Sequence, residues 1–292
     1  MQVDLAADPH YIAESLAITE EIRFRLIDML IGFHRASESC VETLFLAANI
    51  FDRHLANPST ESKRRWSMEE LTLIAMTALL IASKYEEQDC FTVEEIQLML
   101  QEQGYRKHRE AIRRCEKNVL ENGVRYCLGW PGPLVFLRRP LHLTRQIQAT
   151  GDYACESAEP DEFLEPAAQY LLEITLLGGE FLEYLPCVLA AGAYRLARMI
   201  CGRIGPADCV PSDGNQNISL HRGHSSDHCE YLGEDGEDGG DLTDLIIMIV
   251  RRFREPKYRR SLTYRKYRSG KHGIFAKQVN EVMERGFKLS LE

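Results

Sequence analysis

The residues after Ser67 constrain the fold more than any other part of the chain, because they are apolar around the whole circumference of a helix. Residues 71–83 read LTLIAMTALLIAS and contain no charged side chain. At the 3.6-residue period of an α-helix, this composition leaves no polar stripe to face water. Such a helix is stable only when other helices enclose it. The stretch therefore predicts the central helix of a helical bundle.

Two capping boxes mark helix starts around this stretch, each a hydroxyl followed three residues later by a carboxylate. The pairs are Ser67 with Glu70 and Thr92 with Glu95. Upstream, an apolar helical pattern stops before Pro58, because proline restricts the backbone of the residue that precedes it. We therefore expect several successive helices in the first hundred residues.

The second half of the chain repeats the pattern of the first after the break WPGP at residues 130–133. When TALLIAS is aligned with GAYRLAR, small residues four apart coincide, and such residues let neighbouring helices approach closely. The coincident pairs are Ala78 with Ala193 and Ala82 with Ala197. Because strand-like alternation is not convincing anywhere, the predicted class is all-α with two duplicated bundles.

The predicted boundaries place a first bundle at residues 20–137 and a second at residues 138–285. A segment at 1–19 precedes them and a tail at 286–292 follows. Within the second bundle, residues 202–240 are dominated by Gly, Ser, His and Asp and end in GEDGEDGGD. A stretch so poor in apolar side chains cannot offset the entropy of ordering. It is predicted to be a flexible insertion.

Bulk properties exclude several classes of protein. The net charge of −9 disfavours a protein that coats nucleic acid by general attraction. The sequence contains no apolar run long enough for a membrane span, and its start lacks the layout of a secretory signal. Nine cysteines without a C-x-x-C pair favour reduced thiols over a disulfide framework. A cytosolic or nuclear protein is expected.

Four segments resemble the cyclin family, in particular B-type mitotic cyclins of the fungal kind. LIAMTALLIASKYEE at 73–87 resembles the signature helix of the cyclin box, and ETLFLAANIFDRHLA at 42–56 resembles the helix before it. WPGPLVFLRR at 130–139 and YLLEITLL at 170–177 add to the likeness. The resemblance implies two tandem five-helix cyclin boxes and the activation of a cyclin-dependent protein kinase, which would be the partner in a heterodimer that acts in G2/M control.

Five positions characteristic of the first cyclin box are matched in type by Arg23, Asp52, Leu73, Lys84 and Glu116. By the resemblance, Arg23 and Asp52 form a structural salt bridge between two helices, and Leu73 belongs to the core of the box. The lysine and glutamate reach the kinase, so Lys84 and Glu116 are expected to be contact residues. Lys84 would donate to carbonyls of the partner, and Glu116 would accept from its amides.

Apolar kinase contacts of the family are matched by Tyr85, Leu120, Tyr126 and Leu128. Ordinary core packing is the alternative interpretation of each of these side chains. Between Glu116 and the Trp-Pro break, the chain has one residue more than the family spacing. We expect a bulge or an early helix end near residues 122–123 to absorb it.

Many mitotic cyclins carry a groove on the first box that docks Arg-x-Leu peptides of substrates and inhibitors. The matching positions are Ile22, Leu26, Met29, Gly32 and Thr72. Met29 replaces the tryptophan of the family, and Gly32 replaces the carboxylate that pairs with the arginine of the peptide. The sequence therefore predicts docking that is weak or altered, although Ile22 and Leu26 keep an apolar surface.

Two alternatives compete with kinase activation. A cyclin-fold adaptor or transcription-factor-like scaffold would share the duplicated boxes without activating a kinase. Its best support is residues 251–277, where Arg and Lys alternate with aromatic residues in a pattern typical of nucleic-acid surfaces. We favour a solvated outer face of the second box, because the chain as a whole is acidic. Binding to nucleic acid or a membrane is thus not expected.

Catalysis, cofactors and metals are not predicted. No nucleophile with a base, phosphate-binding loop or carboxylate pair stands out, so we expect a non-catalytic protein without a cofactor. The insertion does contain zinc-ligand types, but their spacing fits no closed structural module. These residues are Cys209, His221, His224, His228 and Cys229. The expected location is the nucleus and the cytoplasm.

Overall fold

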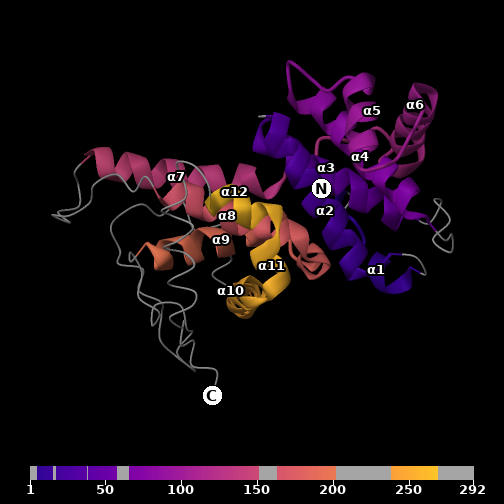
Figure 1. Ribbon diagram of the computed structural model, residues 1–292. Helices are drawn as coiled ribbons and strands as arrows, with labels where there is room; N and C mark the ends of the chain where they lie inside the picture. Colours follow the sequence, from indigo (N-terminus) through magenta and orange to yellow (C-terminus); the bar gives the residue numbers. More distant parts are fainter. Residues whose placement is uncertain are drawn as a thin grey trace.

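The computed structural model of the chain describes residues 5–15, 18–37, 39–57, 66–150, 163–201 and 238–268. Every regular element in these ranges is a helix, so the all-α prediction is confirmed. The helices form two successive groups, coloured indigo to purple and pink to yellow in Figure 1. Among the described helices, none combines the length and apolarity that a membrane span requires.

The first group surrounds α4, the helix predicted to lie at the centre. The group consists of α1 (Tyr11–Glu14), α2 (Glu20–Ser37), α3 (Val41–Ala56), α4 (Met68–Glu86), α5 (Val93–Glu102) and α6 (Arg109–Asn118). Helices α2, α3, α5 and α6 all pack against α4. Because α1 is a single turn, five longer helices make up this box, as expected.

Both predicted capping boxes are present. The Glu70 backbone N–H donates to Ser67 Oγ at 3.2 Å, and Glu70 Oε2 accepts from the Ser67 N–H at 2.9 Å. Thr92 and Glu95 form the same reciprocal pair at 3.2 and 2.7 Å. These bonds satisfy backbone donors that a helix start leaves without an intrahelical partner. They fix the starts of α4 and α5.

The second group surrounds α9 in the same way that the first surrounds α4. Its members are α7 (Pro133–Thr150), α8 (Leu164–Leu177), the 3-10 helix η4 (Gly179–Glu183), α9 (Pro186–Ile200), α10 (Asp238–Arg254), α11 (Pro256–Arg260) and α12 (Leu262–Arg268). Helices α7, α8 and α10 pack against α9. All four alanines of the predicted duplication are fully buried, which supports the alignment of α4 with α9.

Two predicted boundaries differ from the helices that the structure contains. Helix α7 begins at Pro133 and continues past residue 137, so the division expected between residues 137 and 138 falls inside a helix. The insertion was expected to reach residue 240, but α10 begins at Asp238. The rest of the insertion and the tail lie outside the described residues.

Arg23 connects three helices across the junction of the two boxes. Its side chain is 1% exposed, and its Nε and Nη2 atoms donate to both carboxylate oxygens of Asp52 at 2.9 and 2.8 Å. Tyr11 Oη donates to Asp52 Oδ1 at 2.7 Å. The remaining guanidinium nitrogen donates to the Leu176 carbonyl at 3.0 Å. The predicted pair within the first box therefore also holds the C-terminal end of α8 in the second box.

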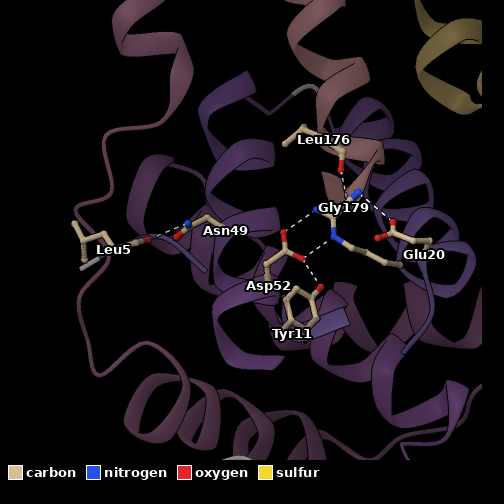
Figure 2. Close-up of polar contacts among 8 residues, drawn as sticks. Leu5, Tyr11, Glu20, Asn49, Asp52, Leu176 and Gly179 are labelled. Atoms are coloured by element: carbon tan, nitrogen blue, oxygen red, sulfur yellow. Dashed lines mark hydrogen bonds and ion pairs between the residues drawn. The ribbon is translucent and has the colours of Figure 1, made fainter. Parts of the chain in front are cut away.

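A second link lies beside this one (Figure 2). Glu20 Oε2, in the first turn of α2, accepts from the Gly179 N–H at 3.2 Å.

Burial alone would lower the pKa of Arg23, but the Asp52 carboxylate raises it above its usual value. Burial, reinforced by Asp52, raises the pKa of Tyr11 well above its usual value. Arg23 thus remains a cation and Tyr11 a hydroxyl donor at neutral pH.

We expect Asp52→Asn to lower the free energy of unfolding by about 3–5 kcal/mol, because it leaves the buried Arg23 charge without its counterion. Urea denaturation at pH 7 measures the change. Arg109→Ala is the control, since Arg109 and Glu94 form an exposed pair at 2.7 Å, which contributes less than about 1 kcal/mol. Equal losses in the two variants would contradict this role for Asp52.

Candidate partner-binding site

Lys84 and Glu116 meet at the surface, although they belong to different helices. Lys84 lies in the last turn of α4 and Glu116 near the end of α6. Lys84 Nζ donates to Glu116 Oε1 at 2.5 Å. Their side chains are 41% and 16% exposed. The structure therefore brings together the two residues predicted to contact a kinase, and leaves both within reach of a partner.

The end of α4 is fixed by polar contacts on either side of Lys84. Ser83 is fully buried, and its Oγ donates to the Leu80 carbonyl at 2.9 Å and accepts from the Phe91 N–H at 3.1 Å. Glu87 Oε1 accepts from the Cys40 N–H at 2.8 Å and from Thr43 Oγ1 at 2.5 Å. These contacts hold the exposed lysine on a rigid base.

Glu87 has a role that the sequence reasoning did not identify. Burial tends to raise the pKa of its carboxyl group, but the hydrogen bonds from Thr43 and Cys40 outweigh that effect and lower it. The carboxylate lies at the N-terminus of α3, where negative charge is favourable. Cys40 occupies the N-cap position of α3, and a thiol is a weak acceptor. A cysteine at the N-cap was therefore the signal in the sequence that another residue accepts hydrogen bonds at the start of α3.

A π-helical turn lies in the segment between Glu116 and Trp130 where a bulge or an early helix end was expected. Helix α6 ends at Asn118, and Val119–Gly123 continues it with wider spacing. The Val124 N–H donates to the Val119 carbonyl, five residues earlier, at 2.9 Å. A π turn accommodates one residue more than an α turn of the same rise. The expected bulge near residues 122–123 is thus confirmed.

The four predicted apolar contacts divide into two kinds. Tyr85 and Tyr126 are 54% and 63% exposed, so core packing does not explain them. Leu120 and Leu128 are half-buried against the hydrophobic core. A Cβ built on Gly129 would lie 3.7 Å from Tyr85 Oη, so the end of α4 and the segment after the π turn are neighbours. The exposed Tyr85 at the end of α4 thus lies next to the segment that carries Leu128.

The π turn packs directly on the C-terminal turn of α3. A Cβ added to Gly123 would lie 2.5 Å from Nδ1 of His54, so only glycine fits without displacement. His54 is fully buried, and burial lowers its pKa to about 4. The neutral imidazole therefore packs against the π turn at Gly123.

Leu73 differs from its predicted place in the core of the box. It is only half-buried and packs against the core from its edge, whereas its neighbours Thr72 and Ile74 are buried. The uniform apolarity of the α4 sequence concealed this difference. The tertiary arrangement determines which face of the helix its neighbours enclose, and so which of its side chains are buried.

The positions of the docking groove are less accessible than expected. Leu26 and Thr72 are each 2% exposed, so they belong to the core and do not present the expected surface. Ile22 and Met29 are half-buried. Gly32 is covered by Leu262, whose Cδ1 would lie 2.6 Å from a Cβ at residue 32.

Helix α12 is held in this place by a carboxylate of the first box. The Leu262 N–H at the start of α12 donates to Asp28 Oδ1 on α2 at 2.6 Å. One end of the predicted groove is therefore occupied by the second box of the same chain.

The basic segment is largely used within the fold. Of its described aromatic residues, Phe253, Tyr258 and Tyr267 are buried and cannot stack on bases, whereas Tyr264 is half-buried. Arg252 pairs with Glu180, and Lys266 Nζ lies 2.6 Å from Glu173 Oε1. These contacts weaken the nucleic-acid alternative for the described part of the segment. Residues 269–277 lie outside it.

Metal ligands do not gather in the described ranges. No group of three or more His, Cys, Asp or Glu side chains there could hold a metal ion. The cysteines and histidines at residues 209–229 that were weighed as zinc ligands lie outside the described residues.

Comparison with known proteins gives matches over both boxes. The family model of the cyclin N-terminal domain matches residues 1–123, and that of the cyclin C-terminal domain matches residues 131–281. The solved structure of a viral cyclin from herpesvirus saimiri overlaps with a TM-score of 0.52 at 14% identity. The overlap covers 93% of this chain and 90% of that one, and at this identity it shows the fold alone.

Curated relatives include several mitotic cyclins. G2/mitotic-specific cyclin-4 of Saccharomyces cerevisiae is 34% identical over 69% of this chain and 39% of its own length. Cyclin-4 of Candida albicans is 36% identical over 67% of this chain and 35% of its own length. G2/mitotic-specific cyclin S13-7 of Glycine max is 32% identical over 77% of this chain and 76% of its own length. The chain thus spans well under half of the two fungal relatives.

The low pKa of His54 predicts a pH dependence of stability. Because its pKa is about 4 in the fold and about 6.5 when unfolded, the unfolded chain binds a proton between these values that the folded chain excludes. The free energy of unfolding therefore decreases as pH falls from 6.5 to 4. We expect wild type to lose about 3 kcal/mol more than His54→Asn in this range.

Urea denaturation at intervals between pH 7 and pH 4 measures this difference. The carboxylates and His34 are common to both proteins, so their contributions cancel in the comparison. Parallel pH profiles for the two proteins would contradict the prediction.

Proposed function

The chain belongs to the cyclin family, and on that premise we propose that it binds and allosterically activates a cyclin-dependent protein kinase in G2/M control. Two tandem cyclin domains are shown by the family matches and the helical fold. The names of the relatives, G2/mitotic-specific cyclins, support the cell-cycle stage. The role is that of a non-catalytic subunit in a heterodimer, acting in the nucleus and the cytoplasm.

The observation that carries this proposal is the Lys84–Glu116 pair at the end of an enclosed helix. Ser83 is buried and Lys84 is exposed, so the cation projects from a helix whose position packing determines. A contact group on a rigid element loses little entropy when it docks. The ammonium group has three donors and uses one on Glu116. The others can reach carbonyl groups of the kinase, while the Glu116 carboxylate accepts from its amides.

The proposed mechanism requires no chemistry from this chain. By the family resemblance, the first box grips a mobile helix of the kinase, so that a glutamate of that helix pairs with the phosphate-binding lysine. The activation loop moves away from the substrate site at the same time. Preferential affinity of the box for this active arrangement shifts the equilibrium of the kinase.

The adaptor alternative has less support than kinase activation. Its main argument was the basic C-terminal segment, and three of the described aromatic residues of that segment, Phe253, Tyr258 and Tyr267, are buried in the second box. Tyr85, which follows Lys84 in the chain, and Tyr126 are by contrast exposed. Exposed aromatic side chains such as tyrosine are enriched at protein-binding surfaces.

We expect Lys84→Ala and Glu116→Ala each to weaken association with the kinase by about 1–3 kcal/mol, because each leaves a desolvated polar group of the partner without its mate. The same variants should lose less than about 1 kcal/mol of folding stability, since the pair is partly exposed. Titration calorimetry with a purified cyclin-dependent kinase measures the first quantity, and urea denaturation the second.

Arg109→Ala is the matched control for this pair of variants. It removes a different ion pair, which joins α5 to α6 at the opposite end of α6 from Glu116. Kinase affinity and histone phosphorylation should be unchanged by it. A kinase that is equally active with and without the wild-type chain would contradict the proposed function.

We expect weak docking of Arg-x-Leu peptides, because Gly32 has no carboxylate and lies beneath Leu262. Titration calorimetry with such a peptide should show no binding at micromolar concentrations. The double variant Gly32→Glu with Leu262→Ala supplies the carboxylate and the space, and should bind more tightly than wild type. A wild-type Kd of about 1 μM or lower, equivalent to a binding free energy of about −8 kcal/mol, would contradict this expectation.

A further inference from the structure

The segment after the π turn has an unfavourable backbone conformation. Arg125 and Tyr126 are consecutive and have φ angles of 51° and 58°, in the left-handed region. For residues with a Cβ atom, this region costs about 1–2 kcal/mol each. Tyr126 in this segment is exposed, and Gly129 just beyond it lies close to Tyr85 at the end of α4. Such a path persists only where other groups hold it.

Arg53 of α3 supplies that restraint. Its Nη1 atom donates to the Cys127 carbonyl at 2.7 Å, and its Nη2 atom donates to the Val124 carbonyl at 3.2 Å. These two carbonyls belong to the residues immediately before and after the left-handed pair. One planar guanidinium group therefore joins the two ends of the reversal.

Two residues near Arg53, at the C-terminal end of α3, contact the π turn that precedes the left-handed pair. Asn57 Nδ2 donates to the Asn122 carbonyl at 2.5 Å and to the Gly123 carbonyl at 3.3 Å. The His54 ring packs against Gly123. The last turns of α3 thus contact the segment at both the π turn and the left-handed pair, and Arg53 contacts the part next to Tyr126.

We propose that Arg53 is a positioning residue of the kinase-binding surface, which holds Tyr126 and Leu128 in the orientation required for docking. This inference rests on the proposed function. Arginine is required because its rigid fork bonds two carbonyl groups at once. Lysine keeps the charge but is a single flexible ammonium group, which does not span both carbonyls in a defined geometry. Without the fork, the segment would lose its left-handed pair and part of its preorganisation.

The test compares Arg53→Lys with wild type in the full chain. Amide hydrogen exchange of residues 124–128 should become faster in the isolated variant. Kinase affinity, measured by calorimetry well below the unfolding temperature, should fall about tenfold, since restoring the reversal on docking costs at least the strain of one left-handed residue. The rate of histone phosphorylation by a kinase saturated with the variant should be unchanged. Arg109→Lys, on the exposed pair of α6, is the control for the charge-preserving substitution.

A rescue variant separates positioning from general stability. Glycine adopts positive φ without the Cβ penalty, so Arg125→Gly in the Arg53→Lys background should recover part of the lost affinity. Recovery would not be expected if Arg53→Lys acted through global destabilisation, because a new glycine does not restore the lost hydrogen bonds. Unchanged affinity of Arg53→Lys, or a loss that Arg125→Gly does not reduce, would overturn the proposal.

The two readouts distinguish this inference from the proposed function. If the wild-type chain binds no cyclin-dependent kinase, the proposed function fails and Arg53 has no docking surface to position. If wild type binds and Arg53→Lys binds equally well with unchanged exchange at residues 124–128, only the role of Arg53 is overturned.

Discussion

Enclosure of α4 is the constraint on which the rest of the structure depends. A helix without a polar face has to be surrounded, and α2, α3, α5 and α6 provide the surroundings. Packing then leaves the end of α4 little freedom, so the first charged residue beyond the buried section, Lys84, has a defined place on the surface. The same pattern around α9 gives the second box its centre. The apolar interior of the box and its candidate contact site are therefore two consequences of one helix.

The junction between the boxes relies on polar groups instead. Arg23 donates to both carboxylate oxygens of Asp52 and to the Leu176 carbonyl near the end of α8, and Glu20 accepts from the start of η4. A buried arginine is tolerated because its charge is compensated and its donors are used. Apolar contacts at a domain junction permit many relative orientations, whereas these hydrogen bonds have direction. These hydrogen bonds therefore link the relative orientation of the two boxes to α2, a helix that contributes to the core of the first box.

Sequence patterns predicted the elements well where the deciding chemistry is local. Capping boxes at Ser67 and Thr92 involve residues three apart, and the spacing after Glu116 predicted a bulge or an early helix end close to where the π turn lies. Burial within an element could not be predicted in the same way. Leu73 and Leu26 have the same apolar character, but the first lies at the edge of the core and the second inside it, because neighbouring helices decide which face is covered. The cap that Glu87 provides for α3 and the contact of Leu262 with Gly32 also join residues far apart in sequence.

Three consecutive residues near the end of α3 connect these features. Asp52 faces Arg23 at the junction of the boxes, Arg53 holds the reversal that carries Tyr126, and His54 packs beneath the π turn. Consecutive residues on a helix point about 100° apart, so one short stretch can address three different neighbours. A shift of α3 at the junction would therefore move the support of the candidate contact surface with it. The same short stretch of α3 thus contacts both Arg23, which reaches the second box, and the reversal next to the candidate contact surface.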